Sequence, residues 1–136
     1  MTFGRLAFLY GACVVAFLGI DAVWLTLMTP RFYQPRLGGL LAAQPKLGVA
    51  AVFYLLYVVG IVALAVLPGI RGGSAAAALW RGALFGLLAY ATYDLTNLST
   101  IRNWPWDLSV VDIAWGTALT GAISMVGYYT GRWLGL

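Results

Sequence analysis

The chain has 136 residues, of which 62% are hydrophobic and 9% are charged. A soluble domain carries roughly 25% charged residues, so this composition excludes a water-covered surface and makes the lipid bilayer the main solvent. Eight Lys and Arg residues and four Asp residues give a net charge of +4, which suits anionic lipid head groups. The basic residues stand singly and never form a run, which disfavours nucleic-acid binding.

Several kinds of catalytic site are excluded by residue types that the chain lacks. It contains no His and no Glu, so a His-based triad, a His metal site and a Glu general base are ruled out. The single cysteine, Cys13, lies inside an apolar run and is expected to serve packing. The sequence identifies no cofactor.

Four apolar segments are long enough to cross a bilayer, which takes about 20 helical residues. We expect them at 6–28, 47–67, 75–98 and 110–133. Short connections make consecutive spans antiparallel neighbours. The sequence therefore predicts an all-α fold, an integral membrane four-helix up-down bundle that forms a single transmembrane domain over residues 1–136.

Proline and glycine are expected to interrupt the helices between these spans. The segment 36–43, between two prolines, predicts either a short helix on the membrane surface or a plain surface loop. The expected interruptions are Pro30, Pro35 and Pro45 in the first connection, Pro68-Gly69 and Gly72-Gly73 in the second, and Pro105 in the third.

The carboxylates of the spans are expected at one membrane face. Asp21 lies roughly 10 Å inside the end of the first span and Asp94 roughly 6 Å inside the end of the third, at about 1.5 Å per residue. Asp112 lies just inside the fourth span. A charge within a membrane span is costly without a partner or a function. For Asp21 two explanations stay open, a functional site and an ion pair with Arg31, Arg36 or Arg102.

Residues at three- and four-residue steps form one stripe on each of the last two spans. Small residues in such stripes let membrane helices approach closely, so we expect the stripes to face each other. Their polar ends, together with Asp21, would then enclose a pocket that Tyr54 and Tyr57 could line. The stripes are Gly82, Gly86, Tyr90, Tyr93, Asp94 and Asn97 in the third span, and Asp112, Gly116, Thr120, Ser124 and Gly127 in the fourth.

A short repeat, D-x-x-W-x-T, occurs at 21–26 and again at 112–117. Its tryptophans, Trp24 and Trp115, are expected either to wall the pocket or to pack between helices. The tryptophans near the span ends are predicted to lie at the membrane interface; these are Trp80, Trp104, Trp106 and Trp133.

Structural roles compete with function for the other carboxylates. Ser109-x-x-Asp112 reads as a capping box at the start of the fourth span, and Asp107 as another cap or a solvated loop residue. Asp94 and Asn97 also favour local hydrogen bonds near a helix end. A metal site is disfavoured because each span carries one Asp only.

Three segments of the chain, 18–34, 90–105 and 110–121, resemble a bacterial family of predicted multi-pass membrane proteins, domain of unknown function 2177. The most specific parts are YDLTN at 93–97 and DIAWG at 112–116. The resemblance implies a four-span protein of the bacterial inner membrane and carries no activity to transfer. Because the basic residues divide evenly between the two sides, the positive-inside rule gives no orientation, and we expect cytoplasmic termini as in other even-numbered bundles.

The leading functional hypothesis is a polar pocket that opens to one membrane face and binds a small or lipidic ligand. The first alternative is a structural subunit that packs against a larger membrane partner, and the second is an ion- or proton-coupled transporter, which would need a homo-oligomer. Whether the chain is an enzyme stays open. The candidate ligand-binding residues are Asp21, Trp24, Tyr54, Tyr57, Tyr93, Asp94, Asn97, Asp112 and Trp115.

Overall fold

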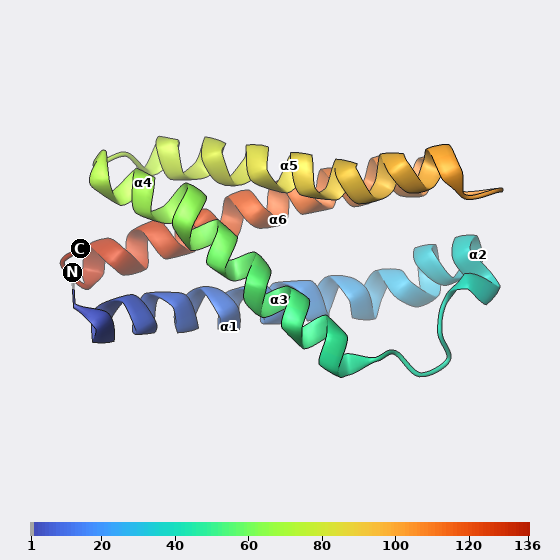
Figure 1. Cartoon of the computed structure of the whole chain (residues 1–136), viewed down its shortest axis with the longest axis horizontal. Coiled ribbons are helices and arrows are strands. Elements are labelled where there is room, and N and C mark those ends of the chain that lie inside the picture. The colour runs from blue at the N-terminus through green and yellow to red at the C-terminus, as the bar shows by residue number, and fades with distance from the viewer. Residues whose placement is uncertain (1) are drawn as a thin grey trace.

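The computed structural model describes residues 2–136, and its regular elements there are all helical. Four helical segments are long and apolar enough to cross a membrane: Phe3–Leu40, Leu47–Arg71, Ala75–Thr100 and Trp106–Trp133. Both termini lie at one end of the molecule, and one segment crosses the others obliquely (Figure 1). The predicted all-α fold with four spans is confirmed.

The first segment continues past the two prolines that were expected to end it. Helix α1 (Phe3–Met28) passes through a widened turn, η1 (Thr29–Tyr33), into α2 (Gln34–Leu37) and η2 (Gly38–Leu40). A proline ring clashes with the carbonyl four residues earlier in a regular helix. For Pro35 that carbonyl belongs to Arg31 inside η1, where hydrogen bonds span five residues, as from the Gln34 N–H to the Thr29 carbonyl. The breaks predicted at Pro30 and Pro35 were therefore wrong, and residues 36–40 continue the first helical segment. The expected break around Pro45 is confirmed, because residues 41–46 are non-helical.

The second segment repeats this arrangement. Helix α3 (Leu47–Ile61) continues through a widened turn, η3 (Val62–Val66), into α4 (Leu67–Arg71). The carbonyl four residues before Pro68 belongs to Leu64, which lies in η3. The break predicted at Pro68-Gly69 was wrong, and the helix ends at Gly72, followed by Gly73 at a φ of 62°.

Helices α5 (Ala75–Thr100) and α6 (Trp106–Trp133) pack closely through small residues. A Cβ added at Gly86 would collide with the Gly116 carbonyl oxygen and the Thr120 side chain. A Cβ added at Gly116 would overlap the ring of Tyr90. The predicted contact between the two stripes is therefore confirmed, and it leaves no room for any side chain at these glycines.

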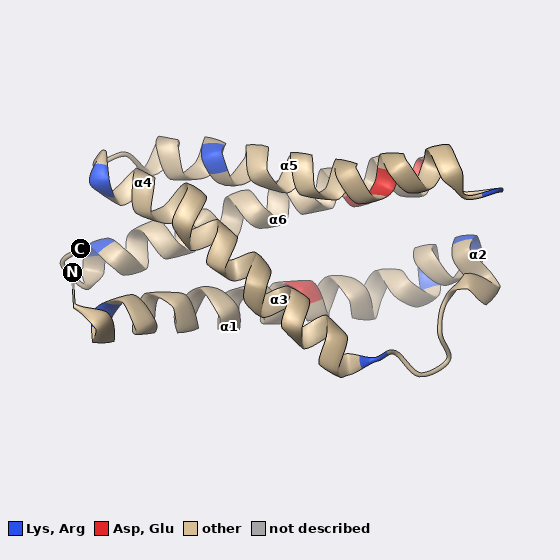
Figure 2. Ribbon diagram, in the orientation of Figure 1, with Lys and Arg blue, Asp and Glu red and all other residues tan. Residues whose placement is uncertain are grey.

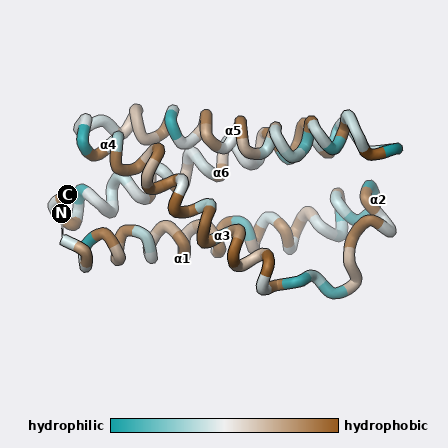
Figure 3. The backbone as a smooth tube through the Cα atoms, in the orientation of Figure 1, coloured by the Kyte–Doolittle hydropathy of each residue, from teal (hydrophilic) through white to brown (hydrophobic). Residues whose placement is uncertain are grey.

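The two halves of the bundle differ in chemistry. An apolar core fills the half nearer the termini, whereas the acidic residues lie in the other half (Figure 2). The backbone is most hydrophobic along α1 and α3 (Figure 3), and α3 leaves large apolar side chains such as Val52, Leu56 and Val59 exposed. Exposed apolar side chains are what a lipid-facing helix requires. The core includes Leu9, Cys13, Phe17, Ile61, Val66, Leu119 and Ile123.

Candidate functional site

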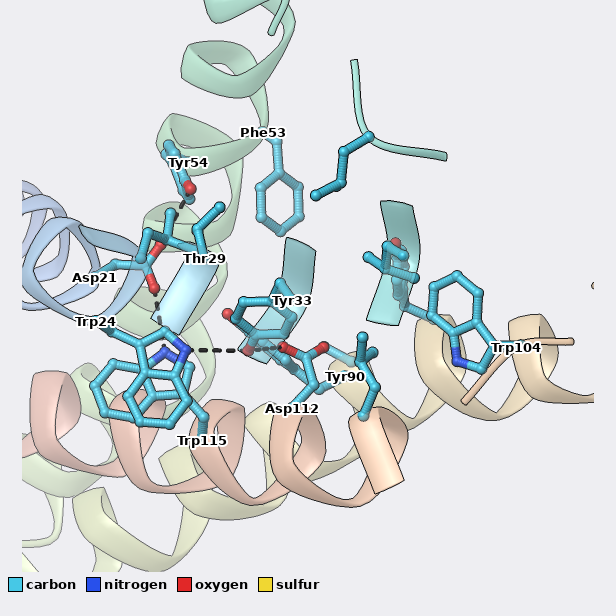
Figure 4. Close-up of a pocket in the computed structure, with 16 residues that line it drawn as sticks. Asp21, Trp24, Thr29, Tyr33, Phe53, Tyr54, Tyr90, Trp104, Asp112 and Trp115 are labelled. Atoms are coloured by element: carbon cyan, nitrogen blue, oxygen red, sulfur yellow. Dashed lines mark hydrogen bonds between the residues drawn. The ribbon is translucent and has the colours of Figure 1, made fainter. Parts of the chain in front are cut away.

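A cavity of about 400 Å³ lies in the acidic half of the bundle. It is formed where the end of α1 and its extension meet the first turns of α3 and α6 and the last turns of α5 (Figure 4). Half of its 16 lining residues are aromatic. The lining comprises Asp21, Trp24, Leu25, Thr29, Tyr33, Leu37, Leu41, Phe53, Tyr54, Ala89, Tyr90, Tyr93, Trp104, Leu108, Asp112 and Trp115.

The two copies of the D-x-x-W repeat meet at this cavity. The repeat places a tryptophan about one helical turn after an aspartate, and α1 and α6 run in opposite directions. Their register brings Trp115 beside Asp21 and brings Trp24 beside Tyr33, which contacts Asp112. The indole rings of Trp24 and Trp115 stack with their centroids 4.1 Å apart.

Asp21 is 7% exposed and receives hydrogen bonds from two neutral donors. The Tyr54 hydroxyl donates to its Oδ2 at 3.0 Å, and the Trp115 Nε1–H donates to its Oδ1 at 3.1 Å. No Arg reaches it among the described residues. The alternative of an ion pair with Arg31, Arg36 or Arg102 is thus wrong, and the charge of Asp21 is solvated by dipoles alone.

Asp112 is linked to Trp24 of the first repeat by two hydrogen bonds that share the Tyr33 hydroxyl. The Trp24 Nε1–H donates to the Tyr33 hydroxyl at 3.0 Å, and that hydroxyl donates to Asp112 Oδ1 at 3.0 Å. The predicted capping box was wrong, because α6 already begins at Trp106. Ser109 instead donates to the Asp94 carbonyl, and Asp107 lies in the first turn of α6.

Asp94 lies behind the cavity wall and is fully buried. Neither of its carboxylate oxygens has a donor within residues 2–136, and its side chain is a close neighbour of Asp112. Two carboxylates cannot hydrogen-bond to each other unless one of them carries a proton. Among the described residues, the Asp94 carboxyl group is the one buried side-chain group without a hydrogen-bond partner.

The cavity wall carries carboxyl groups that no basic side chain within residues 2–136 balances. No Lys or Arg of the described residues lines it. The one ion pair within residues 2–136 joins Arg36 Nε to Asp107 Oδ2 at 2.8 Å and is partly exposed, outside the lining. The described residues also contain no cluster of three or more Asp, Glu, His or Cys that could hold a metal ion.

Six of the nine candidate residues line the cavity, and three do not. Tyr57 donates to or accepts from Thr120 Oγ1 at 2.8 Å inside the core, while Asp94 and Asn97 lie outside the lining. Trp104 was expected at the interface but is buried and lines the cavity, whereas Trp80, Trp106 and Trp133 are exposed.

Tyr33, which links the two repeats, was absent from the candidates. The prolines on both sides of it indicated a break in the helix, so no spacing argument could place it beside Asp112. Tyr90 belonged to the predicted stripe but was not named as a site residue.

Comparisons with known proteins identify the family of this chain but no individual relative. Neither the curated proteins nor the solved structures gave a match to the chain. A family model described as predicted membrane protein, DUF2177, matches residues 6–129, which is nearly the whole chain and includes both repeats. The chain therefore belongs to the DUF2177 family of predicted membrane proteins.

Proposed function

We propose that this protein binds a small or lipidic ligand in the cavity between its two D-x-x-W repeats. One observation carries the proposal: the partly buried carboxylates of Asp21 and Asp112 face an aromatic cavity and are held by Tyr and Trp donors. A volume of about 400 Å³ is within the range of small-molecule sites, which are mostly apolar with a few placed polar groups.

The two alternative functions receive less support. A purely structural subunit would bond its carboxylates to Arg or to the backbone, whereas Asp21 and Asp112 use side-chain donors around open space. A transporter needs a path to the opposite face, whereas Leu9, Cys13 and Phe17 are fully buried in the core of the other half. A transport path would therefore require the helices to separate.

The sequence resemblance supports a location in the bacterial inner membrane. Cytoplasmic termini, the arrangement expected for an even-numbered bundle, would make the cavity open toward the periplasmic side. Cysteine labelling in intact cells tests this orientation. Asn103 lies in the exposed connection at the cavity end, and the native Cys13 is fully buried. A membrane-impermeant maleimide should label Asn103→Cys in intact cells, and labelling that appears only after lysis would place the cavity on the cytoplasmic side.

Ligand binding can be tested with Prodan, a neutral naphthalene dye whose absorption overlaps tryptophan emission. Trp24, Trp104 and Trp115 line the cavity, so a bound dye should show saturable emission sensitised by tryptophan in maltoside micelles. Replacing the lining residue Ala89 by Phe should abolish this signal by filling the cavity.

The matched control is Ala114→Phe, which adds the same ring on an exposed part of α6 outside the cavity. It should leave the dye signal unchanged. Equal signals from both variants, with unchanged helicity by circular dichroism, would show that the dye resides in the micelle and would contradict the proposal.

A further inference from the structure

We propose that the ligand is an organic cation, a substituted ammonium group carried by a free amine or by a lipid head group. This inference rests on the ligand-binding function proposed above and names its chemical class. It follows from the charge of the cavity, the aromatic character of its wall and the way in which its hydrogen-bond donors are used.

The charge of the cavity favours a positive ligand. Asp21 and Asp112 line it, Asp94 lies directly behind Asp112, and no Lys or Arg of the described residues lines it. Two carboxyl groups thus face the cavity itself, without a basic side chain from residues 2–136 in its wall. An uncompensated charge inside a membrane span is costly, so a bound cation would offset the electrostatic cost of these carboxylates.

The wall of the cavity favours an organic cation over a metal ion. Divalent metal ions require several oxygen ligands, whereas the described residues hold no cluster of metal-binding side chains. Aromatic rings attract ammonium groups through their negative faces, and rings that surround such a group are a recurrent way to bind it. Eight aromatic residues line this cavity, among them Phe53, Tyr54 and Tyr90.

The donors nearest the two carboxylates are already engaged, which disfavours an anionic ligand beside Asp21 and Asp112. The Tyr54 hydroxyl and Trp115 Nε1–H donate to Asp21, and the Tyr33 hydroxyl donates to Asp112 (Figure 4). The carboxylate oxygens keep further lone pairs, since each accepts one such bond at most. Around Asp21 and Asp112 the site therefore offers mainly acceptors and aromatic rings to its ligand.

The decisive experiment compares two molecules of the same shape. Butyrylcholine carries a quaternary nitrogen, and 3,3-dimethylbutyl butyrate has a carbon atom in its place. Titration calorimetry of the purified protein in neutral maltoside micelles should give at least tenfold tighter binding of butyrylcholine. The double variant Asp21→Asn/Asp112→Asn should bind both molecules alike, because it keeps the cavity and removes both carboxylates that line it.

A matched control removes one carboxylate at the same end of the bundle. Asp107 lies outside the cavity lining, so Asp107→Asn should retain the preference for butyrylcholine. Saturable binding of both esters with equal affinity by the unaltered protein, or a preference that survives in the double variant, would overturn the cation assignment and leave ligand binding standing. Binding of neither ester, together with loss of the Prodan signal, would overturn both proposals.

The source of the ammonium group is decided by competition. If lysophosphatidylethanolamine in the same micelles displaces butyrylcholine, and lysophosphatidylglycerol does not, the cation belongs to a lipid head group. If neither lipid displaces it, a free amine is the ligand. Displacement by the anionic lipid alone would contradict a cation site.

Discussion

The indole rings of Trp24 and Trp115 stack with planes 5° from parallel and centroids 4.1 Å apart, although the two residues are 91 positions apart in the chain. Each indole N–H points away from its own repeat. That of Trp115 bonds to Asp21, and that of Trp24 reaches Asp112 through Tyr33. This exchange of partners joins α1 to α6 at the level where their charges are buried, and it gives the six-residue repeat a structural meaning.

The exchange predicts a ranking of three Trp→Phe variants in thermal stability. Trp115→Phe removes the only indole donor to the Asp21 carboxylate, and a hydrogen bond to a charged group contributes about 1.5–3 kcal/mol. Trp24→Phe removes a bond to the neutral Tyr33 hydroxyl, which contributes about 0.5–1.5 kcal/mol. Trp106→Phe, at a residue that is 69% exposed, serves as the control and should change little. Melting in detergent measures the order, and equal effects at the three positions would contradict it.

Close packing of α5 on α6 predicts that a single methyl group at Gly86 is destabilising. Its Cβ would meet the Gly116 carbonyl oxygen, which belongs to the backbone and cannot rotate away. Overpacking of this kind costs about 1–3 kcal/mol. Gly11→Ala is the matched control, because nothing lies within 4 Å of its added Cβ, and the better helix propensity of Ala should stabilise α1 slightly. Similar melting temperatures for Gly86→Ala and the unaltered protein would show that the helices separate easily.

Sequence patterns were sufficient for the spans and for the contact between α5 and α6. Both depend on local periodicity: a length of apolar helix, and small residues such as Gly86 and Gly116 on one face. The helix ends were harder to predict because Pro35 and Pro68 each follow a widened turn that accommodates the proline ring. Such turns depend on the backbone hydrogen bonds of several residues together, and no single residue type marks them.

For the carboxylates, too, the sequence predicted one property and missed another. Their placement at one end of the bundle followed from the antiparallel order of the spans. The repeat that contains Asp21 and Asp112 was also visible in the sequence. Their partners were not, because formal charge favoured Arg over the neutral donors Tyr54 and Trp115 that bond to Asp21. Pairing by charge assumes that the long side chain can reach inward, whereas Arg36 remains at the bundle end with Asp107.

Asp94 offers a test of whether its buried carboxyl group has to carry a charge. Its buried oxygens have no donor within residues 2–136, so an amide that supplies an N–H should fit as well as the acid. Asp94→Asn should therefore melt at the same temperature as the unaltered protein or higher. Asp94→Leu should melt lower, because it leaves Asp112 without that neighbour and places a bulkier branched group in a filled space. A clear fall in melting temperature for Asp94→Asn would show that the ionised carboxylate is required.

The last prediction separates the charge of Asp21 from its hydrogen bonds. In Asp21→Asn, the amide oxygen can accept from the Trp115 Nε1–H, and the amide N–H can donate to the Tyr54 hydroxyl, which turns to accept it. Both contacts of the folded protein are thus kept and only the charge is lost. Asp21→Asn alone should melt within a few degrees of the unaltered protein. Combined with Asp112→Asn, it should bind butyrylcholine no better than the neutral isostere 3,3-dimethylbutyl butyrate.

Asp21→Leu is the matched comparison, because it removes the charge and the hydrogen bonds together. It leaves the Trp115 N–H and the Tyr54 O–H without the acceptor that they share in the folded protein. Each buried donor left unpaired costs about 1–3 kcal/mol, so this variant should melt well below Asp21→Asn. If both variants melt equally low, the charge of Asp21 itself stabilises the fold. Its role is then structural, and the ligand-binding role is contradicted. If Asp21→Asn is stable, the negative charge is unnecessary for folding, and its presence in a membrane span is explained by what binds in the cavity.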